Sequence, residues 1–142
     1  MEDHAIVRLE DASKYYQQGR MEVHAVDGLS FEIHKGDFTA LCGPSGSGKT
    51  TVLNLIGGLD VPTGGKVFLE GQDISLLSRS KISAIRRDRI GFVFQAYNLI
   101  PVMTAYENAA FVLSLQGVSD RECRDRVKEI LREVGLEGLE NR

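Results

Sequence analysis

The sequence predicts an α/β fold of about one ordinary domain, and three observations carry this prediction. Apolar residues recur at strand-like spacing through much of the first third of the chain. A glycine-rich segment, 43–48, then separates a short apolar run from a helix-like run. The last third holds two segments that begin with helix-capping residues. Strands therefore lead, mixed strands and helices follow, and helices come last.

The first strands are expected in the order of the chain. Residues 6–9 form a short apolar run, and the polar residues 17–20 predict a turn. Residues 23–33 alternate and indicate one or two strands, broken near 27–28. After a tight turn at residues 34–37, the apolar run 38–42 is typical of a strand buried on both faces.

The elements after the glycine-rich segment follow from caps and apolar runs. A helix is expected over 49–56, where Gly57-Gly58 can close it with a left-handed cap, and a strand over 66–70. A helix capped by Ser78 or Ser80 runs to about Asp88, and 90–94 is a second buried-looking strand.

Two helices are expected in the last third, over 104–115 and 119–134. Thr104 with Glu107, and Ser119 with Glu122, have the spacing of a capping box.

Composition excludes several classes of protein. The 142 residues are 42% apolar and 26% charged, which is typical of a globular protein and not of a disordered one. The net charge of −3 argues against a dedicated nucleic-acid binder, so we expect no nucleic-acid partner. No apolar run reaches the length of a membrane span, and the acidic start lacks the features of a signal peptide. Cys42 and Cys123 have no metal-site spacing, so both thiols are expected to be free in a reducing, intracellular compartment.

Basic residues are concentrated between positions 79 and 89. The favoured interpretation is a solvated helix face, and the alternative is a docking surface for an acidic partner. The only acidic residue among them is Asp88, and the basic residues are Arg79, Lys81, Arg86, Arg87 and Arg89.

One motif carries chemistry. It matches the phosphate-binding pattern G-x-x-x-x-G-K-[ST] in full, between an apolar run and a helix as that pattern requires. Glycines allow a backbone whose N–H groups face an anion, the lysine reaches the β and γ phosphates, and the following hydroxyl ligates Mg²⁺. A chance glycine loop is the alternative. The motif consists of Gly43, Pro44, Ser45, Gly46, Ser47, Gly48, Lys49 and Thr50.

The motif alone does not say which nucleoside triphosphate binds. The N-K-x-D tetrapeptide usual in guanine-specific GTPases does not occur. A small nucleotide kinase is a competing interpretation, because Arg86, Arg87 and Arg89 are suited to an arginine-rich lid.

Three further segments resemble the ATP-binding subunit of ABC transporters. They are LCGPSGSGKTTVLNLIGGLD with VPTGGKVFLEGQDI (41–74), IRRDRIGFVFQAYNLIP (85–101) and LEDASKYYQQG (9–19). The second segment, followed by MTAYENA (103–109), is similar to the subgroup that serves lipoprotein release and macrolide export.

The resemblance implies a partial P-loop NTPase fold of the ABC ATPase type. Residues 1–37 would be mainly an antiparallel β-subdomain, and 38–95 an incomplete P-loop core ending at the Q-loop. Residues 96–142 would begin the helical subdomain.

The same resemblance assigns roles to residues outside the motif. Tyr16 would stack on adenine, with its neighbour Tyr15 as the alternative, because strand alternation turns only one of them toward the nucleotide. A core tyrosine is the structural alternative. Thr51 would lie near the α phosphate. Gln95 would act as the Q-loop glutamine, next to Mg²⁺ or the attacking water, unless it is a solvated loop amide.

Three assignments complete this set. Lys49 and Gln95 would be the catalytic residues, and Thr50 and Gln95 the metal ligands. Residues 97–103 would lie near a membrane subunit, unless Tyr97, Leu99 and Ile100 pack in the core. ATP or ADP with Mg²⁺ is the expected cofactor.

Several parts of the family's ATPase are not found in this sequence, which holds no LSGGQ signature and no apolar strand ending in Asp-Glu. We therefore expect a truncated domain that binds nucleotide and hydrolyses little by itself; a nucleotide-binding module without turnover is the alternative. The family resemblance implies an integral membrane permease as partner, on the cytoplasmic face of the membrane. An unpaired core strand predicts self-association, as a homodimer or a strand-exchanged one.

Overall fold

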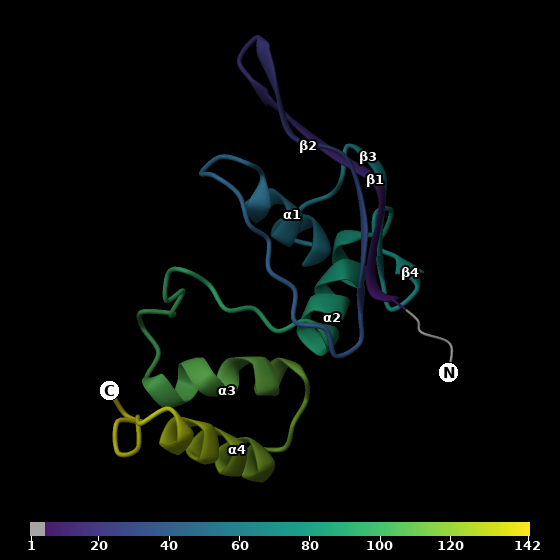
Figure 1. The fold of residues 1–142 in the computed structure, drawn as a ribbon. Coiled ribbons are helices and arrows are strands. Elements are labelled where there is room, and N and C mark those ends of the chain that lie inside the picture. The colour runs from purple at the N-terminus through teal and green to yellow at the C-terminus, as the bar shows by residue number, and fades with distance from the viewer. Residues whose placement is uncertain (1–4) are drawn as a thin grey trace. The chain divides into compact units, whose positions relative to one another are not determined.

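The computed structural model describes residues 5–142, which fall into two compact units. The first unit ends at Arg86 and contains an antiparallel sheet with a helix against it. The second unit runs from Arg87 to Arg142 and contains a pair of helices (Figure 1). The predicted α/β class with an antiparallel β-subdomain is confirmed.

The sheet has four strands in the order β2-β1-β3-β4. The long strands β1 (Ala5–Gln18) and β2 (Met21–His34) form a hairpin. β3 (Gly64–Leu69) pairs with the other edge of β1, and the short β4 (Gln72–Asp73) pairs with β3. β1 is longer than the strand predicted over 6–9, because its polar second half also pairs with β2, as far as Gln18.

A bulge interrupts β1. The pairing register shifts between Leu9 and Ala12, and Asp11 has φ +46°, with its N–H donating to Ser30 Oγ at 2.8 Å. Gly65 of β3 lies against the bulge, where a Cβ would come within 2.2 Å of the Asp11 carbonyl oxygen. Leu9 and Ala12 both enter the core although three positions separate them, so the bulge changes which residues of β1 face inward.

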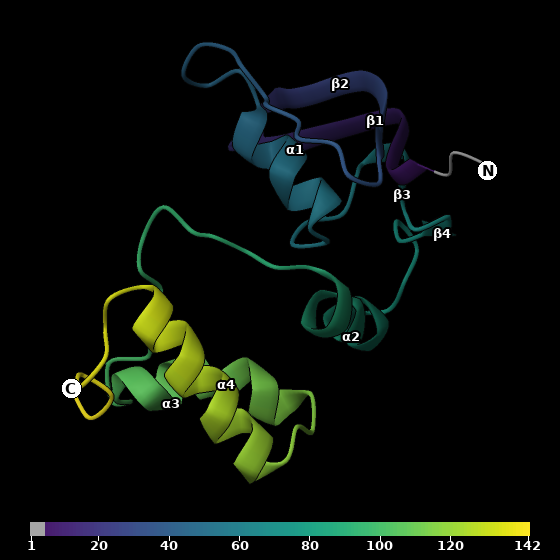
Figure 2. The same ribbon diagram turned by 60° about the horizontal axis from the view of Figure 1, so that its bottom comes forward.

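The helix α1 (Lys49–Ile56) lies on one face of the sheet (Figure 2). Its residues Val52 and Leu55 are buried in a core with side chains from β1, β2 and β3. The predicted left-handed cap is confirmed at Gly58, which has φ +61°. The Leu59 N–H donates to the Asn54 carbonyl at 2.8 Å, as in a Schellman motif. The helix α2 (Arg79–Arg89) follows β4 and has no buried residue.

In the second unit, α3 (Ala105–Leu115) packs on α4 (Asp120–Glu133). Their shared core contains Ala110, Cys123, Val127 and Leu131. Both predicted helices are confirmed. The capping box at the start of α3 is complete, and at α4 the Ser119 side chain accepts the Glu122 N–H.

Two predicted strands are not formed. Residues 38–42 and 90–94 have no regular structure, and the side chains of Phe38 and Val93 are fully exposed at 101% and 102%. A strand needs hydrogen-bonded neighbours, and a buried one needs them on both edges. Among residues 5–142 no strand pairs with either segment. The expectation of two strands of a central sheet is therefore wrong for these segments.

Within residues 5–142, none of the helices has the length and apolar character that crossing a bilayer requires.

Candidate nucleotide-binding site

The glycine-rich loop runs from residue 43 into the start of α1. Gly46 and Gly48 have φ values of +81° and +87°, so both adopt the left-handed conformation that the motif predicts. Gly48 caps α1, and a Cβ on it would lie 2.2 Å from the Ala25 carbonyl oxygen of β2. The loop is therefore held against β2 by a contact that only glycine permits.

The ammonium group of Lys49 folds back over this loop. It donates to the carbonyl oxygens of Gly43 and Pro44 at 2.8 and 2.7 Å, and reaches Ser47 Oγ at 3.4 Å. Within the described part of the chain, no carboxylate pairs with Lys49. Its charge is shared only among neutral oxygens, so an arriving phosphate would meet an uncompensated cation.

The N-terminus of α1 is also suited to an anion. No side chain caps it, and its first turn contains no acidic residue. The first N–H groups of a helix have no partner within the helix, and the helix dipole places partial positive charge there. Thr50 is exposed in this turn and Thr51 is half-buried. The loop, the lysine and the helix start therefore fit a chain of phosphates, and the Thr50 hydroxyl is of the oxygen type that Mg²⁺ prefers.

Tyr16 and Tyr15 leave β1 on opposite faces of the sheet. The bulge places Tyr16 on the face that carries α1, where its hydroxyl donates to Asp60 Oδ2 at 2.7 Å. The Tyr15 hydroxyl instead donates to Asp27 at 2.8 Å, and its ring lies 4.2 Å from that of His24. Of the two tyrosines, Tyr16 is the one that the fold brings next to the helix of the loop.

Asp60 was not expected at this site, and neither was Lys14. Lys14 Nζ donates to Asp60 Oδ1 at 2.5 Å and lies 5.1 Å from the centre of the Tyr16 ring. Burial alone would raise the pKa of Asp60, but hydrogen bonds from Lys14, Tyr16 and the Val61 N–H hold it below its ordinary value. The hydrogen bond to Asp60, with burial, raises the pKa of Tyr16. Sequence carries no signal for this cluster, because Asp60 lies more than forty residues from both partners.

Gln95 lies in the second unit, in an exposed bend. Its role beside the phosphate loop of the first unit therefore stays a prediction. In the same unit, Tyr97 and Leu99 are 94% and 64% exposed, so the alternative of core packing is wrong for both, while Ile100 is half-buried.

A residue that sequence reasoning missed orders the end of this segment. The Asn108 side chain accepts the Ile100 N–H at 2.7 Å. Its amide nitrogen also donates to three carbonyl oxygens, those of Ile100, Met103 and Thr104.

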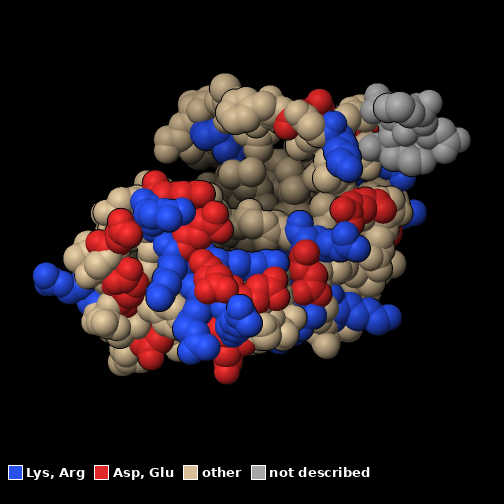
Figure 3. Space-filling model, turned by 90° about the horizontal axis from the view of Figure 1, so that it is seen from below, with Lys and Arg blue, Asp and Glu red and all other residues tan. Residues whose placement is uncertain are grey.

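The basic residues around α2 are partly engaged within the chain. Arg86 donates to the Gly58 carbonyl at 2.7 Å, and Arg87 forms two bonds of 2.7 Å with Asp88. Acidic and basic side chains are interspersed over the face shown in Figure 3. The bonds that Arg86 and Arg87 form within the chain favour a solvated helix face over a docking surface of one charge.

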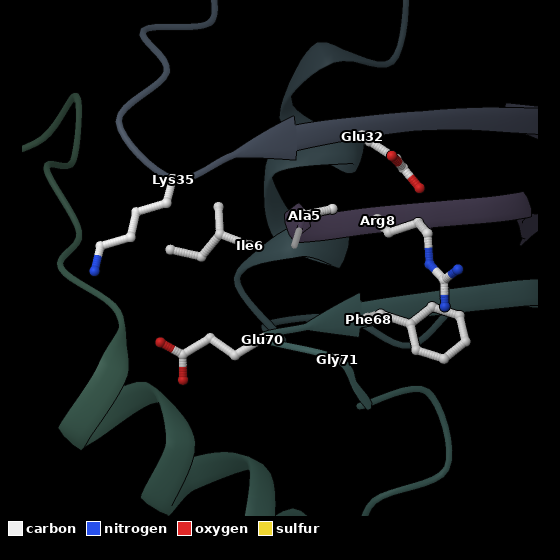
Figure 4. Close-up of a pocket in the computed structure, with 8 residues that line it drawn as sticks. All are labelled: Ala5, Ile6, Arg8, Glu32, Lys35, Phe68, Glu70 and Gly71. Carbon is white, nitrogen blue, oxygen red and sulfur yellow. The ribbon is translucent and has the colours of Figure 1, made fainter. Parts of the chain in front are cut away.

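A separate hollow of about 660 Å³ lies on the sheet of the first unit (Figure 4). The Arg8 guanidinium stacks over the Phe68 ring at 4.3 Å and bonds Glu10 at 3.1 Å. None of the residues predicted from the motif lines this hollow, so it is distinct from the candidate site.

Comparisons with known proteins identify the family of this chain. The profile of the family described as "ABC transporter" matches residues 26–142. An "Uncharacterized ABC transporter ATP-binding protein" of Thermotoga maritima is 44% identical over 92% of this chain and 56% of its own length. A "Macrolide export ATP-binding/permease protein" of Brucella abortus is 41% identical over 92% of this chain and 20% of its own length. The chain thus spans about half or less of these relatives.

A solved structure is similar over most of the chain. It is that of the ATP-binding cassette MJ0796 of Methanocaldococcus jannaschii, described as dimeric, in a post-hydrolysis state and bound to ADP and Pi. It has a TM-score of 0.89 and 40% identity, and the match covers 95% of this chain and 60% of that one. At 40% identity, the two chains are similar in sequence as well as in fold.

Proposed function

This chain belongs to the ABC transporter family, within its ATP-binding domain, and on that premise we propose that the loop 43–50 binds ATP or ADP together with Mg²⁺. The observation that carries the proposal is the uncapped start of α1 beside a lysine that bonds only neutral oxygens. The bound ADP and Pi of the similar cassette support the same class of ligand.

Each residue of the site would contact a different part of the nucleotide or the Mg²⁺ ion. Lys49 would exchange its carbonyl partners for the β and γ phosphates, which are stronger acceptors because they are charged. The backbone of Gly46 and Gly48 and the first turn of α1 would hold the remaining oxygens, with Thr51 nearest the α phosphate. Thr50 and Gln95 would ligate Mg²⁺, which supplies neutralisation of the phosphate charge when it is bound.

Base recognition would fall to Tyr16. The residue as a whole is 39% exposed, and aromatic stacking is tolerant of the base it meets. Tyr15 is the weaker candidate, because its ring is occupied by His24.

We further propose that the whole protein couples ATP binding and hydrolysis to an integral membrane permease, in macrolide-type export or lipoprotein release, from the cytoplasmic face. The name of the Brucella relative, which joins ATP-binding and permease functions, supports such a partner. The dimeric cassette supports a homodimer. The exposed Phe38 and Val93 support self-association of this chain, including by strand exchange.

Isothermal titration with ATP and Mg²⁺ tests the proposal. Lys49→Ala should weaken ATP binding at least tenfold, because a charge-assisted contact to phosphate is lost. The matched control is Lys66→Ala, which removes an exposed lysine of β3 and should leave the affinity unchanged. Unchanged ATP affinity in Lys49→Ala would show that the loop is not the phosphate site.

A further inference from the structure

We infer that Asp60 is a positioning residue for base binding, because its carboxylate holds the Tyr16 ring in the place where it receives adenine. The inference rests on the proposed function, in which Tyr16 stacks on the base. It adds a residue that lies outside the phosphate-binding motif and gives it a defined role in affinity.

Asp60 is itself firmly held. Its Oδ1 accepts hydrogen bonds from Lys14 Nζ at 2.5 Å and from the Val61 N–H at 2.8 Å, and its own N–H donates to the Asn54 carbonyl of α1 at 3.2 Å. The carboxylate therefore stands at the C-terminal end of the loop helix in one orientation. Its second oxygen, Oδ2, remains for the Tyr16 hydroxyl at 2.7 Å.

The Tyr16 ring is consequently fixed at both ends. Pairing of Tyr16 with Val23 of β2 fixes its backbone, and Asp60 fixes its hydroxyl. Lys14 Nζ lies over the ring at 5.1 Å, and the exposed 39% of the residue leaves surface for a base. A side chain ordered before binding loses no further rotational entropy when a ligand stacks on it, so the tether raises affinity without touching the nucleotide.

The protonation states support a lasting tether. Hydrogen bonds from Lys14 and Tyr16 outweigh the effect of burial and keep the pKa of Asp60 below its ordinary value of 3.8. The same bond and burial raise the pKa of Tyr16 above 10.0. At neutral pH the carboxylate is therefore charged and the phenol still carries the proton it donates.

The deciding experiment compares ATP with inorganic tripolyphosphate, which has the phosphates but no base, in titrations of the 142-residue chain. Tyr16→Phe keeps the ring and the Lys14–Asp60 ion pair but loses the tether. We expect its ATP affinity to fall roughly two- to tenfold, in line with the cost of ordering one side chain. Its tripolyphosphate affinity should stay unchanged, because the loop is untouched.

Asp60→Ala provides a second route to the same loss. Its ATP affinity should fall as in Tyr16→Phe, and the double variant should lose no more than either single one. Unchanged tripolyphosphate affinity in Asp60→Ala shows that the loop is still folded. Tyr15→Phe is the matched control: it removes the hydroxyl bonded to Asp27 and should not alter ATP affinity.

The outcomes separate two failures. Wild-type ATP affinity in Tyr16→Phe, while Tyr16→Ala weakens it, overturns the tether and leaves stacking intact. Wild-type ATP affinity in Tyr16→Ala overturns the stacking role itself, and with it the inference. Equal losses for ATP and tripolyphosphate in Tyr16→Phe would also overturn the inference, because they would indicate damage to the loop.

Discussion

Replacing Gly48 with alanine tests whether the close packing of the phosphate loop against β2 stabilises the fold. An added Cβ would lie 2.2 Å from the Ala25 carbonyl oxygen and 3.6 Å from Val26 Cγ2. The loop or the strand must then move by about 1 Å to restore ordinary contact. The φ of +87° adds strain of its own for any residue with a side chain.

Gly46 supplies the matched comparison. It has nearly the same φ, +81°, but a Cβ on it would meet no atom within 4 Å. Gly46→Ala should therefore cost only the backbone strain, about 1 kcal/mol of unfolding free energy. Gly48→Ala should cost about 2–4 kcal/mol, because overpacking adds to that strain.

Urea unfolding in the absence of nucleotide, monitored by far-ultraviolet circular dichroism, gives the unfolding midpoint of each variant. We expect Gly48→Ala to unfold at clearly lower urea than Gly46→Ala. Equal midpoints would refute the reasoning, because the two substitutions differ in the contact with β2 and not in φ.

Two further outcomes are expected. Acid should weaken the fold through Asp60, whose pKa is lower in the folded chain than in the unfolded one. The carboxylate stabilises the fold at any pH above its unfolded pKa of 3.8, and this stabilisation is lost as the pH falls through the lower, folded pKa. Thermal unfolding of wild type and Asp60→Asn from pH 2 to 6 measures this, and parallel curves would argue against it. Thr104→Ala should destabilise the second unit by about 1 kcal/mol, because the α3 capping box is lost. Hydrogen exchange in α3 would report the change, and unaltered protection would contradict it.

Local chemistry predicted the helices well. Thr104 with Glu107 and Ser119 mark helix starts by side-chain bonds that need no distant partner, and Gly58 marks a helix end by its positive φ. The phosphate loop could likewise be predicted, because its conformation depends on Gly46 and Gly48 and its chemistry on the adjacent Lys49.

Features that depend on distant partners escaped prediction. The apolar runs 38–42 and 90–94 have the composition of buried strands, but a strand forms only beside another strand. Asp60 lies in a loop like many others until folding brings Lys14 and Tyr16 to it. Alternation also left open which of Tyr15 and Tyr16 faces α1, because no residue pattern revealed the bulge that precedes them in β1.

The bulge at Asp11 bears on how well the site would tolerate a change of register in β1. Straightening the strand there with every residue kept would restore simple alternation after Leu9 and turn the second half of β1 over. In most strands such a slip would replace a functional side chain by an unrelated one. Here the neighbour is also a tyrosine, so an aromatic ring would still face α1 in either register. Gly65, whose missing side chain leaves room for the bulged carbonyl, thus helps to decide which of two adjacent tyrosines serves the site.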